Sequence, residues 1–424
     1  KNSTKVSEFF RFGVTDRFKV YKYYDKNFTF DIDPVFGIGY DFSRGNYSQF
    51  GGIKFKGRIS DFIGFYFDYR DFTETGDSLD FDKAFTPETG IQTLQRTETS
   101  MNYSEARGGL TFGWSWGNFS VAKDFINIGS SYQSSVIMSS KAPSFPFMRL
   151  DISPVDWFQY NFVHAWLDSQ MIDSTTIRHI GPEAKYRGSD SYSRRFKYYV
   201  SHTFSFKPFE NWWLTFGESI IYGDRLEFIY FITLFYRLAD HYNMIGGDTG
   251  DNAQIFFNTS YRWTKIKSRF YFSLYIDEFS TSKLIEGTGD NPQVLAWTVG
   301  GKLTNPLWSD NYITLEYNAL KPYNYLNSDP LHHYTSSDYQ LGHWIGTNAV
   351  QYLIFIEQYI TRLIKIEAKY QFIQQGSKED INDYSNRVES TYPLLSGDVS
   401  DYSEFGFKVI YNPVHDLFFN LNFS

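Results

Sequence analysis

The chain contains no cysteine among its 424 residues. This absence excludes the disulfide frameworks that hold many small secreted domains together. Long apolar runs are missing as well: residues 228–232 form one that ends at Thr233, and residues 352–356 form another that ends at Glu357. A spanning helix needs roughly 20 consecutive apolar residues, so helical insertion into an inner membrane is excluded.

An excess of positive charge is also missing. The net charge is -8 and the isoelectric point is near 5.6, whereas a nucleic-acid-binding surface is basic and clustered. We therefore expect no nucleic-acid partner. The mean hydropathy of -0.41 gives no sign of a membrane protein, but strands that are apolar on only one face dilute this average. Aromatic residues, in contrast, are abundant at 21% of the chain.

Apolar and polar residues alternate along much of the chain. In residues 363–372, Ile364, Ile366 and Ala368 share one face, whereas Lys365 and Glu367 share the other. A period of two over that length predicts a β-strand with one apolar and one polar face. The same alternation occurs in segments 28–42, 53–59, 63–70, 110–116, 196–206, 270–276, 405–411 and 417–423.

The connections between these segments alternate in length. Short turns rich in Gly, Pro, Asn, Asp or Ser occur at residues 60–61, 116–118, 154–156, 208–211, 309–311 and 412–416. Longer polar segments lie at residues 73–102, 169–192, 280–291, 321–347 and 375–400. This rhythm is typical of an outer-membrane barrel, which has short periplasmic turns and long extracellular loops.

The predicted fold class is therefore all-β: a transmembrane antiparallel β-barrel of about 18 strands, within a range of about 16 to 18. About 17 strands can be counted from Phe28 to Phe423, and single-chain bacterial barrels usually have an even number. We expect residues 1–27 to supply an extra strand or a periplasmic plug, and residues 28–424 to form the barrel. The expected location is the bacterial outer membrane.

A soluble β-sandwich would alternate in the same way. Phe, Tyr and Trp dominate one face, however, as in the aromatic girdles of membrane proteins, and charges of both signs occupy the other. Residues 225–240 fit a helical stripe at least as well as a strand. We expect them to fold into the lumen or to form an extracellular helix, with an imperfect strand plus loop as the alternative.

Several short stretches occur in an order that resembles a known family. They are residues 51–59, 63–66, 121–125, 128–130, 139–147, 217–223, 228–237, 276–279, 316–318, 321–325 and 340–343. Together they resemble the Wzi-like capsule-assembly family of outer-membrane proteins, in particular its Bacteroidota branch, which includes gliding-motility-related members. The resemblance covers roughly residues 28–420. It implies an 18-stranded barrel that attaches or organises surface polysaccharide without bond chemistry.

Carboxylates at four positions are candidates for a charged network in the lumen: Glu218, Asp277, Glu278 and Glu316. Glu218 lies on the apolar parity of its strand, so a structural ion pair with an Arg or Lys of a neighbouring strand is the alternative to a ligand-binding role. Paired carboxylates can serve glycosidases, but the sequence does not give their separation. The string Gly113-Trp-Ser-Trp-Gly117 matches a nucleophile elbow, yet it lies in a strand without a following helix. We therefore expect no enzyme activity.

Asp and Asn oxygens cluster in two glycine-rich loops. Asp248, Asp251 and Asp290 are weak candidates for Ca²⁺ ligands, because their spacing fits no EF-hand and solvated turns explain them better. We expect no cofactor and no dedicated metal site.

One long loop is rich in aromatic residues, and aromatic rings can stack on the apolar faces of sugars. The candidate polysaccharide contacts are Tyr323, Tyr325, Tyr334, Tyr339 and Trp344. The alternative is a loop that folds on its own aromatic rings over the mouth of the barrel.

Three functions remain open from the sequence. The first is a lectin-like barrel that anchors or organises capsule or exopolysaccharide. The second is a structural subunit of an envelope motility or secretion assembly, and the third is a porin for small solutes. The expected partners are outer-membrane lipid and lipopolysaccharide, surface polysaccharide and other envelope proteins.

Overall fold

The computed structural model describes residues 2–3, 21–42, 44–179, 190–232, 235–236, 251–278, 294–377, 393–414 and 417–423. Within these residues, the main feature is a twenty-stranded antiparallel sheet. The first half of this sheet contains β1 (Asn2–Ser3), β2 (Tyr21–Tyr24), β3 (Phe28–Asp41), β4 (Asn46–Ile59), β5 (Ile63–Thr75), β6 (Thr93–Arg96), β7 (Ser100–Trp114), β8 (Gly117–Asp124), β9 (Phe145–Val155) and β10 (Phe158–Ile172).

The second half contains β13 (Arg194–Phe209), β14 (Trp212–Gly223), β15 (Asn252–Trp263), β16 (Ser268–Glu278), β17 (Val294–Thr304), β18 (Asn311–Leu320), β21 (Ala349–Tyr359), β22 (Ile364–Gly376), β23 (Val399–Val414) and β24 (Leu417–Phe423). Short pairs β11 (Arg178–His179) with β12 (Asp190–Ser191), and β19 (Thr335–Ser336) with β20 (Tyr339–Gln340), lie in connections. The 3-10 helices are η2 (Ser174–Thr176), η3 (Phe228–Phe231), η4 (Thr264–Ile266) and η5 (Pro330–His332). No helix among the described residues is long and apolar enough to cross a membrane.

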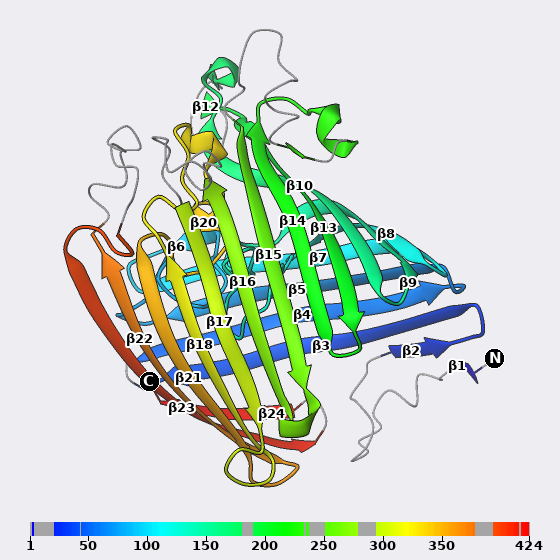
Figure 1. Cartoon of the computed structure of the whole chain (residues 1–424), viewed down its shortest axis with the longest axis vertical. Helices are drawn as coiled ribbons and strands as arrows, with labels where there is room; N and C mark the ends of the chain where they lie inside the picture. Colours follow the sequence, from blue (N-terminus) through cyan, green and yellow to red (C-terminus); the bar gives the residue numbers. More distant parts are fainter. Residues whose placement is uncertain are drawn as a thin grey trace.

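Consecutive strands of the large sheet pair with each other. Apart from the short β1 and β6, each strand of this sheet from β2 to β24 pairs with the next strand of the sheet along the chain. β10 therefore pairs with β13, and β18 pairs with β21. This makes eighteen strands in meander order, as predicted. The sheet curls so that β13 to β18 cross in front of β3 to β5 (Figure 1). No pairing joins β24 to β2 or β3 among the described residues, so the sheet is not closed along this seam.

The connections alternate in length around the sheet. Short turns join β4 to β5, β7 to β8, β9 to β10 and β13 to β14, while long segments join β5 to β7, β8 to β9 and β18 to β21. The turn between β3 and β4 is a short exception on the long-loop side. In Figure 1, β12 lies at the top and the turn with η4 lies at the bottom. Short turns are periplasmic in barrels of this class, so the long connections face outward.

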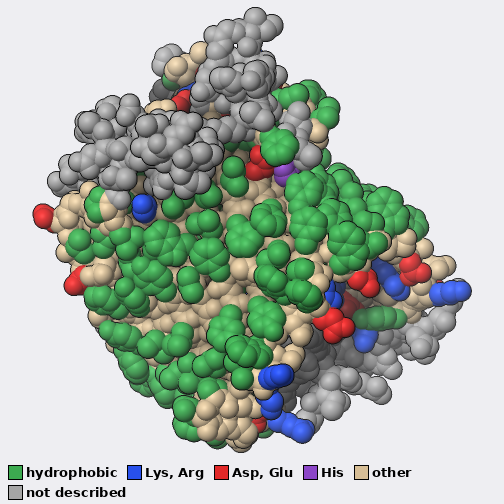
Figure 2. All heavy atoms as spheres, in the orientation of Figure 1, with side chains coloured by type: hydrophobic (Ala, Val, Ile, Leu, Met, Phe, Trp, Pro, Cys, Tyr) green, Lys and Arg blue, Asp and Glu red, His purple; other side chains and the backbone are tan. Residues whose placement is uncertain are grey.

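The outer face of the sheet is apolar. Phe36 and Ile38 on β3 and Phe405 on β23 lie on the outward parity of their strands and are 76%, 80% and 62% exposed. Figure 2 shows apolar side chains spread over this wall, with few charged groups among them. Exposure of so many apolar groups is unfavourable in water and favourable in lipid, and the strands satisfy one another's backbone groups there.

Long connections fold into the concave side of the sheet. Residues 125–144 and 321–348 pack against inward-facing side chains of β9, β10, β13 and β16 to form the largest buried cluster. Val136, Ile137 and Met138 from the first segment and Leu341 and Ile345 from the second are fully buried there. We call these two segments together the plug. They occupy much of a lumen for which the sequence predicted a polar lining and left open whether it is plugged.

The segment after β14 takes a different path. Its described part, residues 225–232 and 235–236, contains η3 and packs on the outer face of β13 and β14, where Tyr198 and Tyr222 are buried beneath it. The expectation that this segment folds into the lumen is therefore wrong. The expected extracellular helix is not tested over its whole length, because residues 233–234 and 237–240 lie outside the described residues. Aromatic side chains on this part of the barrel wall give the segment an apolar surface outside the lumen.

Candidate binding site in the barrel lumen

Backbone and side-chain hydrogen bonds attach the plug to the barrel wall. The N–H of Ser130 donates to Ser273 Oγ on β16 at 3.1 Å, and the N–H of Tyr132 donates to Glu316 Oε2 on β18 at 2.6 Å. The Tyr325 hydroxyl donates to the carbonyl of Val136, which joins the two plug segments. The plug therefore has a defined position in the lumen.

Two of the predicted lumen carboxylates take part in this attachment. Glu316 also accepts hydrogen bonds from the Tyr271 hydroxyl at 2.6 Å and from Asn318 Nδ2 at 3.0 Å. Asp277 Oδ2 accepts from the N–H of Tyr325 at 2.6 Å. Both carboxylates are buried in the wall and bond to the plug.

The other two predicted lumen carboxylates lie elsewhere. Glu278 is the last residue of β16, and its side chain lies outside the described residues. Glu218 does not belong to a lumen network: it lies on the outer face of β14, level with His202 on β13, and its Oε1 is 2.7 Å from His202 Nε2. The parity of β14 directs it outward, where the carboxylate contacts His202 and accepts hydrogen bonds from the N–H groups of Phe235 and Tyr236. Among the described residues, no Arg or Lys of a neighbouring strand pairs with it, although the structural alternative had expected such a pair.

The predicted sugar-contacting rings are mostly buried. Tyr325 and Tyr334 stack with centroids 5.6 Å apart, and Tyr275 of β16 packs within 5.3 Å of both. Tyr323 and Trp344 are 4% exposed, and Tyr339 is half-buried with its hydroxyl on the carbonyls of Asp82 and Ile91. In this arrangement the rings pack against protein. Their contact with polysaccharide stays a prediction.

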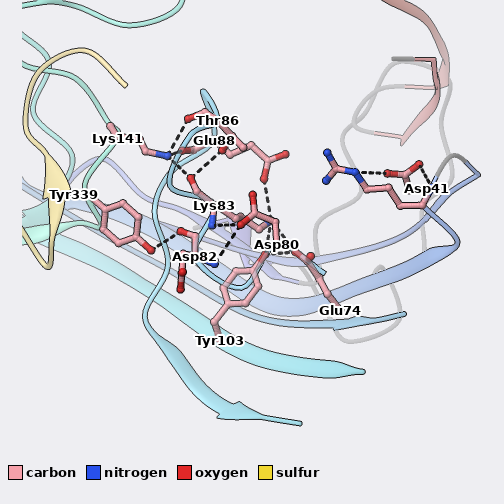
Figure 3. A network of polar contacts seen from close by, with 11 residues as sticks. Asp41, Glu74, Asp80, Asp82, Lys83, Thr86, Glu88, Tyr103, Lys141 and Tyr339 are labelled. Carbon is pink, nitrogen blue, oxygen red and sulfur yellow. Dashed lines mark hydrogen bonds and ion pairs between the residues drawn. The ribbon is translucent and has the colours of Figure 1, made fainter. Parts of the chain in front are cut away.

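A lysine joins the plug to the β5–β7 connection. The Lys141 ammonium donates to the backbone carbonyls of Lys83, Thr86 and Glu88 (Figure 3). The N–H of Gly90 returns a bond to the Lys141 carbonyl at 2.7 Å. Burial lowers the pKa of Lys141 to about 8, although Glu88 and Asp80 oppose this effect.

Lys83 occupies the centre of the same network. Its ammonium lies 2.8 Å from both Glu74 Oε1 and Glu88 Oε2, and the Tyr103 hydroxyl donates to Glu74 at 2.7 Å. Figure 3 shows these groups converging on Lys83 from β5, β7 and the connection. Burial alone would lower the pKa of Lys83, but the two carboxylates raise it above its ordinary value. Lys83 therefore remains charged.

Beside this network lies a cavity of about 350 Å³ on the inner face of β5, β7 and β8. On one side Asp68 binds Arg70 through two contacts of 2.9 and 3.0 Å and Arg107 through one of 2.8 Å. On the other side Lys123 Nζ donates to Ser144 Oγ at 2.6 Å and lies 3.3 Å from Glu105. The cavity volume is within the roughly 300–1,000 Å³ range of small-ligand sites.

Aromatic rings remain accessible near this region. Phe85, from the connection that carries Lys83, lies 5.3 Å from Trp344 and 5.4 Å from Tyr402 of β23 by ring centroids. Phe85 is 39% and Tyr402 48% exposed. Sequence reasoning missed both of them. The inward parity of Tyr402 on its strand was an available signal, but no local pattern distinguishes Phe85.

The calcium prediction rests on three carboxylates. Asp251 accepts the Tyr230 hydroxyl at 2.6 Å and lies 3.7 Å from His332 Nε2. Asp248 and Asp290 lie outside the described residues. Within the part of the chain that the structure describes, no group of three or more His, Asp or Glu side chains could hold a metal ion.

The curled antiparallel meander, the apolar exterior and the polar interior define an outer-membrane β-barrel. The fold is similar to that of the Escherichia coli outer-membrane protein Wzi, described as a carbohydrate-binding β-barrel involved in group 1 capsule assembly, with a TM-score of 0.51 and 12% identity over 94% of this chain and 81% of that one. The apolar belt and this fold place the protein in the outer membrane.

Two further solved structures cover most of the chain. Pseudomonas aeruginosa OccD3 (OpdP) has a TM-score of 0.48 and 12% identity over 94% of this chain and 84% of that one. Pseudomonas aeruginosa OprD has a TM-score of 0.44 and 12% identity over 93% and 86%. No protein-family model and no curated protein sequence matches the chain.

Proposed function

We propose that the protein binds surface polysaccharide on the extracellular side of a plugged barrel and catalyses no reaction. The observation that carries this proposal is the lumen cavity of about 350 Å³, which lies beside packed connections and is lined by paired charges and hydroxyls. The description of Wzi as carbohydrate-binding agrees with it. The resemblance of the sequence to the Bacteroidota branch of the Wzi-like capsule-assembly family supports the same proposal.

The chemistry of the cavity suits a sugar. The charges of Asp68, Arg70 and Arg107 are already paired, so the site holds no isolated charge that would require an ion. Each hydroxyl group of a sugar can both donate and accept a hydrogen bond. The wall of the cavity offers donors from Arg and Lys and acceptors from Asp and Glu. Phe85 and Tyr402 do not line the cavity, but Phe85 belongs to the connection that contributes Lys83 to it, and both rings are exposed and available to the apolar face of a pyranose.

The proposal can be tested with the purified protein and fragments of the surface polysaccharide of its host. Calorimetry should show binding, and the double variant Phe85→Ala/Tyr402→Ala should weaken it by roughly tenfold, or about 1.4 kcal/mol. Phe62→Ala, which removes a 55% exposed ring from a periplasmic turn, is the matched control. Deleting the gene should release polysaccharide into the medium while synthesis continues. Absence of binding together with unchanged retention would refute the proposal.

A porin for small solutes is the second candidate, and a specific observation favours it. Lys54 and Lys56 are exposed on the inner face of β4, away from the plug. Lys365 and Lys369 on β22 also face the lumen, where Glu367 and Glu404 pair with them, so this part of the wall is charged and polar. In planar bilayers a porin would conduct ions, and Lys54→Glu/Lys56→Glu would shift its selectivity toward cations. A silent bilayer would eliminate this candidate.

A further inference from the structure

The segment on the outer wall has a built attachment. We call its described residues, 225–232 and 235–236, the outer clasp. Glu218 accepts hydrogen bonds from the N–H groups of Phe235 and Tyr236, and from His202. Phe235 has a left-handed φ of 67°, which is uncommon for a side chain of this size. Successive N–H groups in such a turn form a concave site for an anion, and here the carboxylate occupies it.

Aromatic packing holds the rest of the outer clasp. Tyr230 and Tyr236 are fully buried, with Tyr230 4.9 Å from Tyr222 and Tyr236 4.6 Å from His202 by ring centroids. Phe231 stacks on the His164 ring of β10 at 4.5 Å. All the wall residues involved lie on the outward parity of their strands. The clasp therefore covers polar groups that would otherwise face lipid.

The opposite side of the outer clasp is apolar and uncovered by the described residues. Phe228, Ile232 and Phe235 are 72%, 82% and 64% exposed. The neighbouring wall is the apolar belt: Ile255, which pairs with Glu218 across β14 and β15, points outward and is 52% exposed. The clasp residue that contacts Glu218 is thus level with a lipid-facing position.

We infer that the outer clasp is an in-plane membrane anchor whose exposed side chains contact the acyl chains of outer-leaflet lipids. Glu218 holds the outer clasp on the wall through its hydrogen bonds, and we call it the latch. The exposed side chains of the clasp are continuous with the apolar belt, which indicates lipid as the occupant. The clasp also contacts the extracellular plug region: Tyr230 donates to Asp251, and the adjacent Asn252 donates to the carbonyl of His332 in η5 at 3.0 Å. The anchor does not depend on what the lumen binds.

The absence of cysteine permits a direct test, since a single introduced cysteine is the only labelling site. Ile232→Cys would carry a nitroxide in the full-length protein in vesicles of phospholipid and lipopolysaccharide. We expect high collision with oxygen and low collision with a water-soluble nickel chelate, as at Phe216→Cys on the outer wall. Ser328→Cys, in an exposed loop, provides the aqueous reference.

Other occupants give other results. A label at residue 232 as accessible to nickel as the one at residue 328 would place the clasp in the polar sugar layer and overturn the inference. Low accessibility to both reagents would indicate protein contact, and dipolar broadening between labels would identify a second copy. Either outcome excludes lipid as the occupant.

The latch is tested in the same labelled protein. Glu218→Gln should narrow the electron paramagnetic resonance lines of the nitroxide at residue 232. The label becomes more mobile because the carboxylate no longer accepts hydrogen bonds from the two N–H groups and His202. Glu210→Gln, on an exposed turn, is the matched control. Heat-dependent gel migration verifies that both variants have folded. An unchanged spectrum in folded Glu218→Gln would overturn the role of Glu218 as latch.

Discussion

At the scale of single residues, Lys141 shows how a charged side chain serves as an internal connector. Its ammonium lies among three backbone carbonyls of a connection that precedes it by more than fifty residues. Those carbonyls are far from any sheet partner, and buried carbonyls without a donor are unfavourable. The lysine ammonium thus supplies the hydrogen-bond donor that these three carbonyls would otherwise need from water.

Replacing Lys141 with methionine should destabilise the β5–β7 connection, because three carbonyls lose their charged donor. The expected loss is about 2 kcal/mol. Limited proteolysis between residues 76 and 92 would report it as faster cleavage. Lys123→Met, which removes an exposed lysine from the neighbouring cavity, is the control. Equal cleavage of the two variants would show that Lys141 has no special role.

The lowered pKa of Lys141 makes stability depend on pH. The folded protein releases this proton near pH 8, whereas the unfolded chain keeps it up to its ordinary value of 10.5. In that interval the unfolded state binds more protons, so this group increases the stability of the folded state as pH rises. Thermal unfolding should show the increase in the wild type and not in Lys141→Met. Parallel curves for both proteins would contradict it.

At the scale of elements, the strands were predictable and the connections were not. One face of each barrel strand contacts lipid and the other faces the lumen, so apolar and polar residues alternate along its sequence. β22 follows the predicted parity, with Lys365, Glu367 and Lys369 facing inward. The connections depend on distant partners instead, as when Gln92 bonds Ser337, 245 positions away. No local pattern encodes such a contact.

Gly300 on β17 illustrates how strand and plug are coupled. A Cβ at this position would lie 2.4 Å from the Tyr271 ring, whose hydroxyl bonds Glu316. Gly300→Ala should displace the ring, loosen the Tyr132 attachment and cost about 1–3 kcal/mol. Gly113→Ala, where a Cβ meets nothing within 4 Å, is the matched control. In detergent, Gly300→Ala should unfold at a lower urea concentration than Gly113→Ala. Equal unfolding midpoints of the two variants would refute the coupling.

At the scale of the whole molecule, the sequence predicted a barrel of the correct size and orientation pattern but not a filled lumen. The plug residues 125–144 include apolar side chains such as Ile126, Val136 and Met138, which carry no strand periodicity. Their burial requires walls contributed by β10, β13 and β16. The sequence predicted Asp277 and Glu316 as lumen carboxylates, and they attach the plug to the wall, whereas the cavity beside Lys83 depends on the folded connections.

Replacing residues 126–143 with a short Gly-Ser linker should leave the strands paired and empty much of the lumen. Conductance in planar bilayers should then exceed that of the intact protein, because the segment contributes the largest buried cluster inside the sheet. A similar linker in place of residues 226–232, on the outer wall, should leave conductance unchanged. No difference between the two deletions would mean that the plug does not obstruct the lumen.

The plug also determines the order in which the protein folds. Ser139 bonds Gly342 across 203 positions, and the strands from β9 to β18 lie between these two residues in the chain. Closing such long loops costs chain entropy before any contact repays it, so these contacts form late. The barrel wall must therefore assemble around a lumen that is still empty, and the apolar plug segments remain exposed until then. A chaperone that shields apolar surface before membrane insertion would be needed most for residues 125–144.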